Sequence, residues 1–98
     1  MVEFGVKIIK DKVLNLGESY KEVEFVRCYN LGAVLKNCIW YSGVWETGSW
    51  MYGYWKGGIW KDGTWLDGTW ANGIFEKGWW FDGTWKGGTF EDGVRVKK

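Results

Sequence analysis

The sequence predicts an all-β chain folded as a solenoid, in which short strands and corners alternate around one axis. Glycine recurs at every fifth position, at Gly43, Gly48, Gly53, Gly58, Gly63, Gly68, Gly73, Gly78, Gly83, Gly88 and Gly93. An aromatic residue keeps the same period, at Trp40, Trp45, Trp50, Trp55, Trp60, Trp65, Trp70, Phe75, Trp80, Trp85 and Phe90. We expect these aromatic rings, called the core ladder below, to converge on a shared dry axis.

The period of five excludes an uninterrupted strand or helix. Side chains alternate along a strand, so an odd period would send successive aromatic rings to opposite faces. In an α-helix, five residues advance the side chain by about 140° net, and each glycine would cost roughly 1 kcal/mol relative to alanine. A corner in every pentad removes the conflict, because it resets the alternation before the next aromatic residue.

The residues between the aromatic positions have the chemistry of corners and short strands. Pairs such as Asp62-Gly63 and Asn72-Gly73 tolerate positive φ. Residues before the aromatic are often β-branched, as at Ile59 and Thr64. The same pairs also favour hairpin turns, so a meander of short hairpins is the alternative architecture. The solenoid is favoured because a flat ribbon would leave one face of tryptophan in water.

A weaker form of the pattern extends toward the N-terminus in the same register. A small residue precedes a larger one by two at Val23-x-Phe25, Cys28-x-Asn30, Ala33-x-Leu35 and Cys38-x-Trp40. Residues 23–94 are therefore predicted to form one solenoid. Residues 1–22 are predicted to be an N-terminal cap, with residues 6–9 and 13–16 forming a short hairpin across Asp11 and Lys12. Residues 95–98 are predicted to be a basic C-terminal tail.

The small-x-large spacing over residues 23–94 resembles the pentapeptide-repeat family. In that family a small residue, usually alanine, precedes a central leucine or phenylalanine by two. The resemblance implies a right-handed, four-sided β-helix with four pentads per turn, and hence roughly three to four turns here. This chain departs from the family in carrying glycine for alanine and tryptophan for leucine, so an unchanged prism would be overpacked.

Two further resemblances bear on the alternatives. The segment from Tyr52 to Gly58 is similar to MORN repeats, which implies the meander of short hairpins, although MORN units are longer than a pentad. Tandem Gly-Thr-Trp tracts resemble segments of phage and large-virus proteins, which implies a phage or virus setting.

The composition argues against an enzyme. The chain has no histidine, and therefore lacks the commonest general base and metal ligand. Its acids, such as Asp62, Asp67 and Asp82, recur at equivalent corners and are interpreted as turn formers. Cys28 and Cys38 are too few for a disulfide scaffold and are expected to be reduced and buried. We expect no catalytic residue, no cofactor and no metal site.

Charge and hydropathy restrict the classes of partner and the cellular locations that we expect for this chain. The formal net charge is +1 and basic residues are interleaved with acids, so no nucleic-acid partner is expected. Residues 1–20 contain no long apolar run, so neither a signal peptide nor a transmembrane segment is expected, and a membrane partner is disfavoured. These observations favour a cytoplasmic or virion location.

Outward apolar residues supply the candidate binding surface. If four pentads make a turn, residues twenty apart stack, and two neighbouring apolar columns form beside Phe81. The predicted partner-binding residues are Tyr54, Ile59, Ile74, Trp79, Phe81 and Val94. Exposed apolar patches mark partner surfaces, so we expect a protein partner there, either a second copy or a virion component. The alternative is a carbohydrate- or cell-wall-binding module that stacks a glycan on exposed tryptophan.

Overall fold

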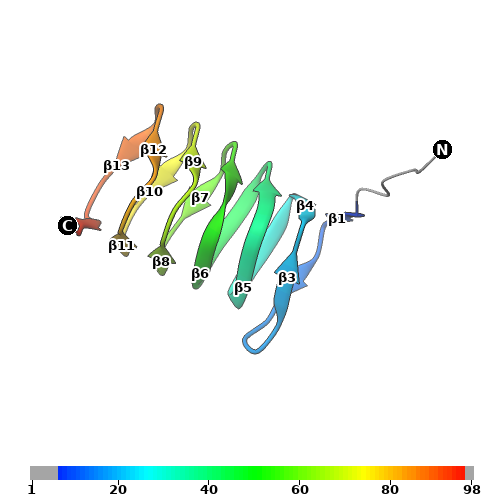
Figure 1. Ribbon diagram of the computed structural model, residues 1–98. Helices are drawn as coiled ribbons and strands as arrows, with labels where there is room; N and C mark the ends of the chain where they lie inside the picture. Colours follow the sequence, from blue (N-terminus) through cyan, green and yellow to red (C-terminus); the bar gives the residue numbers. More distant parts are fainter. Residues whose placement is uncertain (1–6, 97–98) are drawn as a thin grey trace.

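A computed structural model describes residues 7–96 of the chain, and all regular secondary structure in that range is β. Fourteen strands form one continuous sheet wound around a single axis (Figure 1). The strands are β1 (Lys7–Lys10), β2 (Val13–Leu14), β3 (Ser19–Lys21), β4 (Val23–Val26), β5 (Cys28–Trp40), β6 (Gly43–Trp55), β7 (Ile59–Trp60), β8 (Thr64–Trp65), β9 (Thr69–Trp70), β10 (Ile74–Phe75), β11 (Trp79–Trp80), β12 (Thr84–Trp85), β13 (Thr89–Phe90) and β14 (Val94–Arg95).

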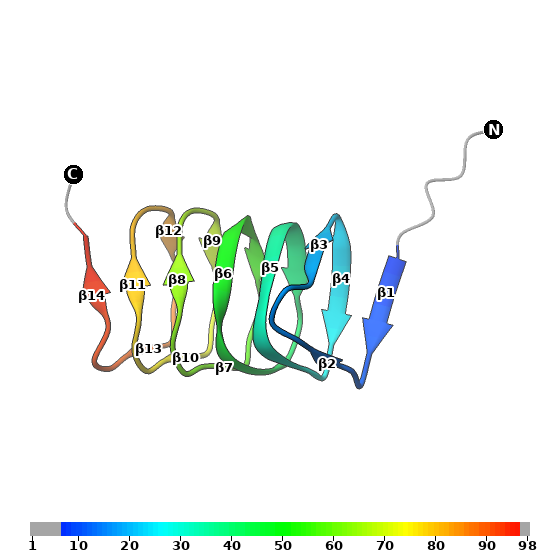
Figure 2. The same ribbon diagram turned by 90° about the horizontal axis from the view of Figure 1, so that it is seen from below.

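The coils stack in parallel with a repeat of fifteen residues. Trp55 of β6 lies beside Trp70 of β9, and Trp80 of β11 lies beside Arg95 of β14. About six such coils follow one another along the axis (Figure 2). The predicted solenoid is therefore confirmed. The expected four pentads per turn and three to four turns are wrong, because each coil contains three pentads and the prism has three sides.

The first coil corrects the predicted hairpin cap. β1 pairs in parallel with β4, and β2 pairs in parallel with β5, so β1 and β2 are not partners of each other. Asp11 has a φ of 53°, and it turns a corner between β1 and β2 just as glycine does later. Arg27 binds Asp11 with a nitrogen–oxygen distance of 2.8 Å, which ties this corner to the next coil. Residues 7–21 thus belong to the solenoid itself; residue 6 lies outside the described residues.

Glycine is required at the later corners for two independent reasons. Gly63 has a φ of 121°, a backbone conformation that residues with a Cβ rarely adopt. An added Cβ there would lie 2.5 Å from the carbonyl oxygen of Gly48 and 3.1 Å from Nε1 of Trp45. Three-sided coils bend more sharply at each corner than four-sided ones. Glycine is therefore required where the chain turns tightly against an indole ring.

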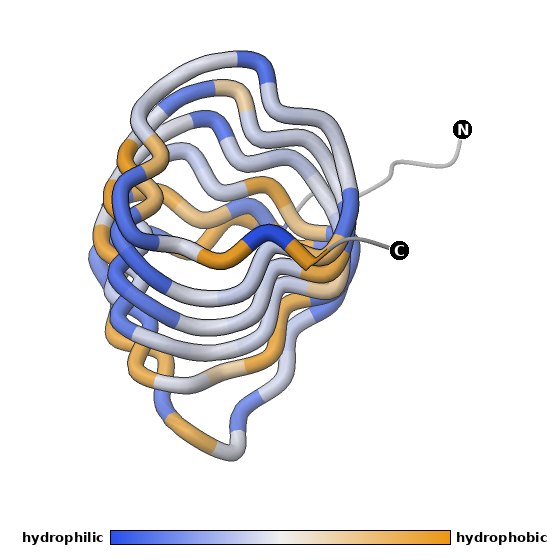
Figure 3. The backbone as a smooth tube through the Cα atoms, turned by 90° about the vertical axis from the view of Figure 1, so that its left-hand side faces the viewer, coloured by the Kyte–Doolittle hydropathy of each residue, from blue (hydrophilic) through white to orange (hydrophobic). Residues whose placement is uncertain are grey.

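Ladder rings fill the axis of the prism in three stacked columns. Rings fifteen residues apart stack, as between Trp45 and Trp60, whose centroids are 4.6 Å apart with planes inclined by 8°. Rings five residues apart meet edge to face, as between Trp45 and Trp50 at 5.9 Å and 73°. Both arrangements are favourable for aromatic quadrupoles and add about 0.5–1.5 kcal/mol per pair beyond the burial of area. Viewed from the C-terminal end, the coils superimpose around this interior (Figure 3).

Burial of the ladder is complete in the middle and declines at the C-terminal end. The ladder residues with no exposed surface are Trp40, Trp45, Trp50, Trp55, Trp60, Trp65, Trp70 and Phe75. Trp80 is 5% exposed, and Trp85 and Phe90 are partly buried. The Arg95 guanidinium carbon lies 4.8 Å from the Phe90 ring centroid and 5.7 Å from that of Trp85. Arg95 thus covers the last rings with a cation.

The N-terminal coils replace part of the ladder with smaller residues. Asn30 occupies a ladder position beside Trp45 and is fully buried. Its Oδ1 accepts hydrogen bonds from the N–H groups of Gly32 and Ala33 at 3.2 and 2.8 Å, and its Nδ2 donates to the Ala33 carbonyl at 3.1 Å. The buried amide is therefore satisfied by the backbone of the adjacent corner.

Candidate partner-binding side

The three sides of the prism redistribute the predicted binding residues. Ile59 pairs with Ile74, and Trp79 pairs with Val94. Tyr54 pairs with Thr69 on the remaining side. The six residues predicted as one patch therefore lie on three different sides. The expected columns were built on a repeat of twenty residues, whereas strands fifteen residues apart are neighbours.

We name each side after one outward residue. The Ile59 side contains β2, β7, β10, β13 and the starts of β5 and β6. The Tyr54 side contains β1, β4, β9, β12 and the ends of β5 and β6. The Trp79 side contains β3, β8, β11, β14 and the middle of β5 and β6.

The Trp79 side carries the most exposed apolar surface of the C-terminal coils. Trp79 is 51% exposed, Val94 is 48% exposed and Phe81 is 37% exposed. Trp79 precedes buried Trp80 on β11, and Phe81 follows it just after the strand ends. Because side chains alternate along a strand, both point outward. These three side chains therefore form an exposed apolar cluster on one side of the prism.

Sequence reasoning found Phe81 but missed Met51, Leu66 and Val96 on this side. Leu66 and Phe81 follow Trp65 and Trp80 by one residue, and their N–H groups donate to the carbonyls of Trp50 and Trp65 at 2.9 Å. Apolar residues therefore recur with a spacing of fifteen, at Met51, Leu66, Phe81 and Val96. A spacing of twenty from Leu66 reaches Lys86 instead. In the sequence, the recurrence of apolar residues at a spacing of fifteen but not of twenty therefore indicates both the length of a coil and the position of the apolar side.

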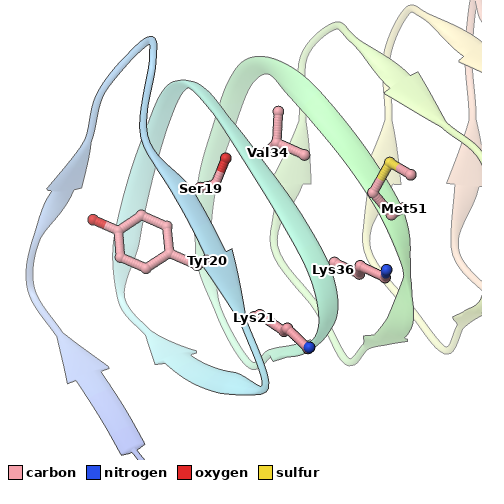
Figure 4. Close-up of a pocket in the computed structure, with 6 residues that line it drawn as sticks. All are labelled: Ser19, Tyr20, Lys21, Val34, Lys36 and Met51. Carbon is pink, nitrogen blue, oxygen red and sulfur yellow. The ribbon is translucent and has the colours of Figure 1, made fainter.

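A shallow pocket lies at the N-terminal end of the same side. It has a volume of about 290 Å³ and is lined by Ser19, Tyr20, Lys21, Val34, Lys36 and Met51. Figure 4 shows Val34 and Met51 beside it, with the Lys21 and Lys36 side chains together along one edge. The pocket thus combines an apolar lining with two ammonium groups at its border.

The other two sides carry polar ties between neighbouring coils. On the Ile59 side the Tyr29 hydroxyl donates to Glu46. On the Tyr54 side the Tyr41 hydroxyl donates to Glu24 at 2.8 Å. Each hydrogen bond to a carboxylate raises the pKa of its phenol above the usual range. These phenols lock the coils together, which is a structural role.

Both cysteines are buried inside the corners. Cys28 Sγ donates to the carbonyl of Ile9 at 3.4 Å, and Cys38 Sγ donates to the carbonyl of Lys36 at 3.3 Å. Burial raises the pKa of the Cys38 thiol, so it stays protonated at neutral pH. Cys38 therefore does not supply a reactive thiolate.

The corner carboxylates are held by the backbone. Oδ1 of Asp62, of Asp67 and of Asp82 each accepts a hydrogen bond of 2.8 Å from the N–H of the following glycine. Within residues 7–96, no group of three or more cysteine, aspartate or glutamate side chains is arranged to hold a metal ion. Nor does that range contain a helix long and apolar enough to cross a membrane.

Comparisons of the chain with protein-family models, with curated proteins and with solved structures give no match.

Proposed function

We propose that the chain is a non-catalytic structural module that binds a protein through its Trp79 side. The observation that carries this proposal is the joint exposure of Trp79, Phe81 and Val94 on one side of the prism. Leaving such rings in water is unfavourable by roughly 25 cal/mol per Å² of apolar surface. A protein partner would remove that surface from water.

The rigidity of the core supports the same role. Rings that stack along the axis and interlock around it leave little freedom for one coil to move against another. A side formed by such coils presents its outward side chains at fixed spacing. The ordering cost of binding is then low, because the surface is already in its binding conformation.

Glycan binding by the core ladder is not part of this proposal. Stacking on a sugar requires an exposed aromatic face, and the ladder rings from Trp40 to Phe75 have no exposed surface. The role as a virion or cytoplasmic component belongs to the proposal, and the resemblance of the Gly-Thr-Trp tracts to phage and large-virus segments supports it. The resemblance to pentapeptide repeats concerns the spacing of small and large residues.

Site-specific photo-crosslinking in living cells tests which side binds. Phe81 is replaced in the full chain by a photo-crosslinking phenylalanine, and Thr69 on the Tyr54 side is replaced in a matched control. We expect a discrete protein adduct from position 81 and none from position 69. No adduct from position 81, or equal adducts from both positions, would contradict the proposal.

A further inference from the structure

We propose that the partner of the Trp79 side is a second copy of this chain, docked with the two solenoid axes antiparallel. The inference rests on the proposed function, since it takes the Trp79 side to be the binding surface. Two features of that side lead to it, the charges along one edge and the pocket, and the area of the side sets its strength.

Charges of opposite sign lie on the same edge of the Trp79 side, at opposite ends of the molecule. Lys21 and Lys36 follow the ladder positions of the first two coils by one residue. Asp67 and Asp82 follow Trp65 and Trp80, in the fourth and fifth coils, by two residues. The downstream edge of this side, formed by the one or two residues after each ladder position, therefore carries Lys36 in the second coil and Asp67 and Asp82 in the fourth and fifth, while Lys21 in the first coil stands beside Glu22.

A two-fold axis parallel to the strands makes these charges meet. Rotation about such an axis reverses the order of the coils but keeps the direction of the strands. The downstream edge of one copy therefore faces the downstream edge of the other. With the axis at the third coil, Lys36 faces the partner's Asp67, whereas Lys21 and its neighbour Glu22 together face the partner's Asp82. Met51, in the third coil, then faces its own symmetry mate. By symmetry, this register forms the Lys36–Asp67 pair twice.

The same register aligns the exposed rings with the pocket. The fifth coil of one copy lies over the first coil of the other, so Trp79 and Phe81 come to the pocket beside Ser19 and Val34. Its volume of about 290 Å³ has room for one aromatic side chain. An aromatic ring in an apolar pocket is the usual anchor of a protein interface.

The area available makes the dimer a weak one. Five overlapping coils at about 4.8 Å and a side of about five residues give roughly 24 by 16 Å, or about 400 Å² of projected surface per copy. This is about half the surface that each partner of a standard specific interface buries, as expected of a weak, transient encounter. We therefore expect a dimer whose population rises with protein concentration in the micromolar range.

Charge reversal with restoration, measured by analytical ultracentrifugation of the full chain, tests the register. Lys36→Glu and Asp67→Lys should each raise the dimer dissociation constant about tenfold or more, and the double variant should return it to within about threefold. Trp79→Ser should remove the dimer. Lys86→Glu on the Tyr54 side and Glu76→Lys on the Ile59 side are matched controls that should change nothing. Circular dichroism checks that each variant is folded.

The outcomes separate this inference from the proposed function. A chain that stays monomeric at all concentrations, or a double variant that does not restore the dimer, overturns the antiparallel pair. If the chain stays monomeric and position 81 still gives its adduct in cells, the Trp79 side remains the binding surface and its partner is another protein. Absence of an adduct from position 81 removes the proposed function as well.

Discussion

Nε1 of Trp45 would lie 3.1 Å from a Cβ placed on Gly63, which stands eighteen residues later in the next coil. The corner of one coil therefore packs directly against the indole ring of the coil before it. The same relationship recurs between Trp60 and Gly78, at 3.1 Å, and between Trp65 and Gly83, at 3.2 Å. Glycine and tryptophan are thus two parts of one packing unit, which explains why they repeat together.

Alanine at this corner should destabilise the fold. Gly63→Ala places a Cβ at positive φ and 2.5 Å from the Gly48 carbonyl oxygen, so we expect a loss of about 2–4 kcal/mol in the free energy of unfolding. Gly57→Ala is the matched control, because its Cβ would approach only the Tyr41 carbonyl, at 3.5 Å. Urea denaturation measures both, and equal effects would contradict the account of the corner.

Removal of one ladder ring should cost more than removal of an exposed one. Trp60 stacks on Trp45 and Phe75 and has no exposed surface, so Trp60→Ala should lower the free energy of unfolding by about 3–5 kcal/mol. Trp79→Ala should change it by about 0.5 kcal/mol or less in the monomer. Thermal unfolding at low protein concentration compares them. Similar losses would mean that the ladder is not the core.

The cation at the C-terminal end should limit fraying. Arg95→Ala removes the guanidinium above Phe90 and Trp85, which we expect to cost up to about 1 kcal/mol. Amide hydrogen exchange should accelerate in β12 and β13 and stay unchanged in β7. Arg27→Ala, which breaks the ion pair with Asp11, should instead act on the first coils. Uniform acceleration along the chain would argue against a local cap.

The Cys38 thiol should be inert while the protein is folded. Burial raises its pKa, so the thiolate needed for reaction with Ellman's reagent is scarce at neutral pH and forms only as pH rises. We expect the reaction to follow global unfolding and to become fast in denaturant. A Cys28→Ser variant isolates Cys38 in this measurement. Rapid modification under native conditions would show that this corner opens readily.

The pentad pattern was sufficient to predict the solenoid and the orientation of the rings. In Gly63-Thr64-Trp65 the corner, the outward residue and the inward ring are all local properties of the sequence. The number of pentads per coil is not local, because a period of five is the same in three-sided and four-sided prisms. Only the outward residues distinguish them, through their apolar spacing of fifteen from Met51 to Val96.

The first coil was mispredicted for a related reason. Two apolar runs around Asp11 are typical of a hairpin, because neighbouring strands usually pair with each other. In this chain the partner of Leu14 is Asn30, in the following coil. Strand pairing across a full coil leaves no local signal, and the left-handed conformation of Asp11 serves a corner as readily as a turn.

A coil of three pentads also governs how such a gene can grow or shrink. Duplication or loss of fifteen residues would lengthen or shorten the rod while every downstream side chain keeps its direction in space. Loss of five would rotate all that follows by a third of a circle, carrying Trp79 and Phe81 away from the lysines they now share a side with. Gain or loss of a whole coil of fifteen residues therefore preserves the alignment of the outward side chains on each side of the prism, whereas gain or loss of one pentad does not.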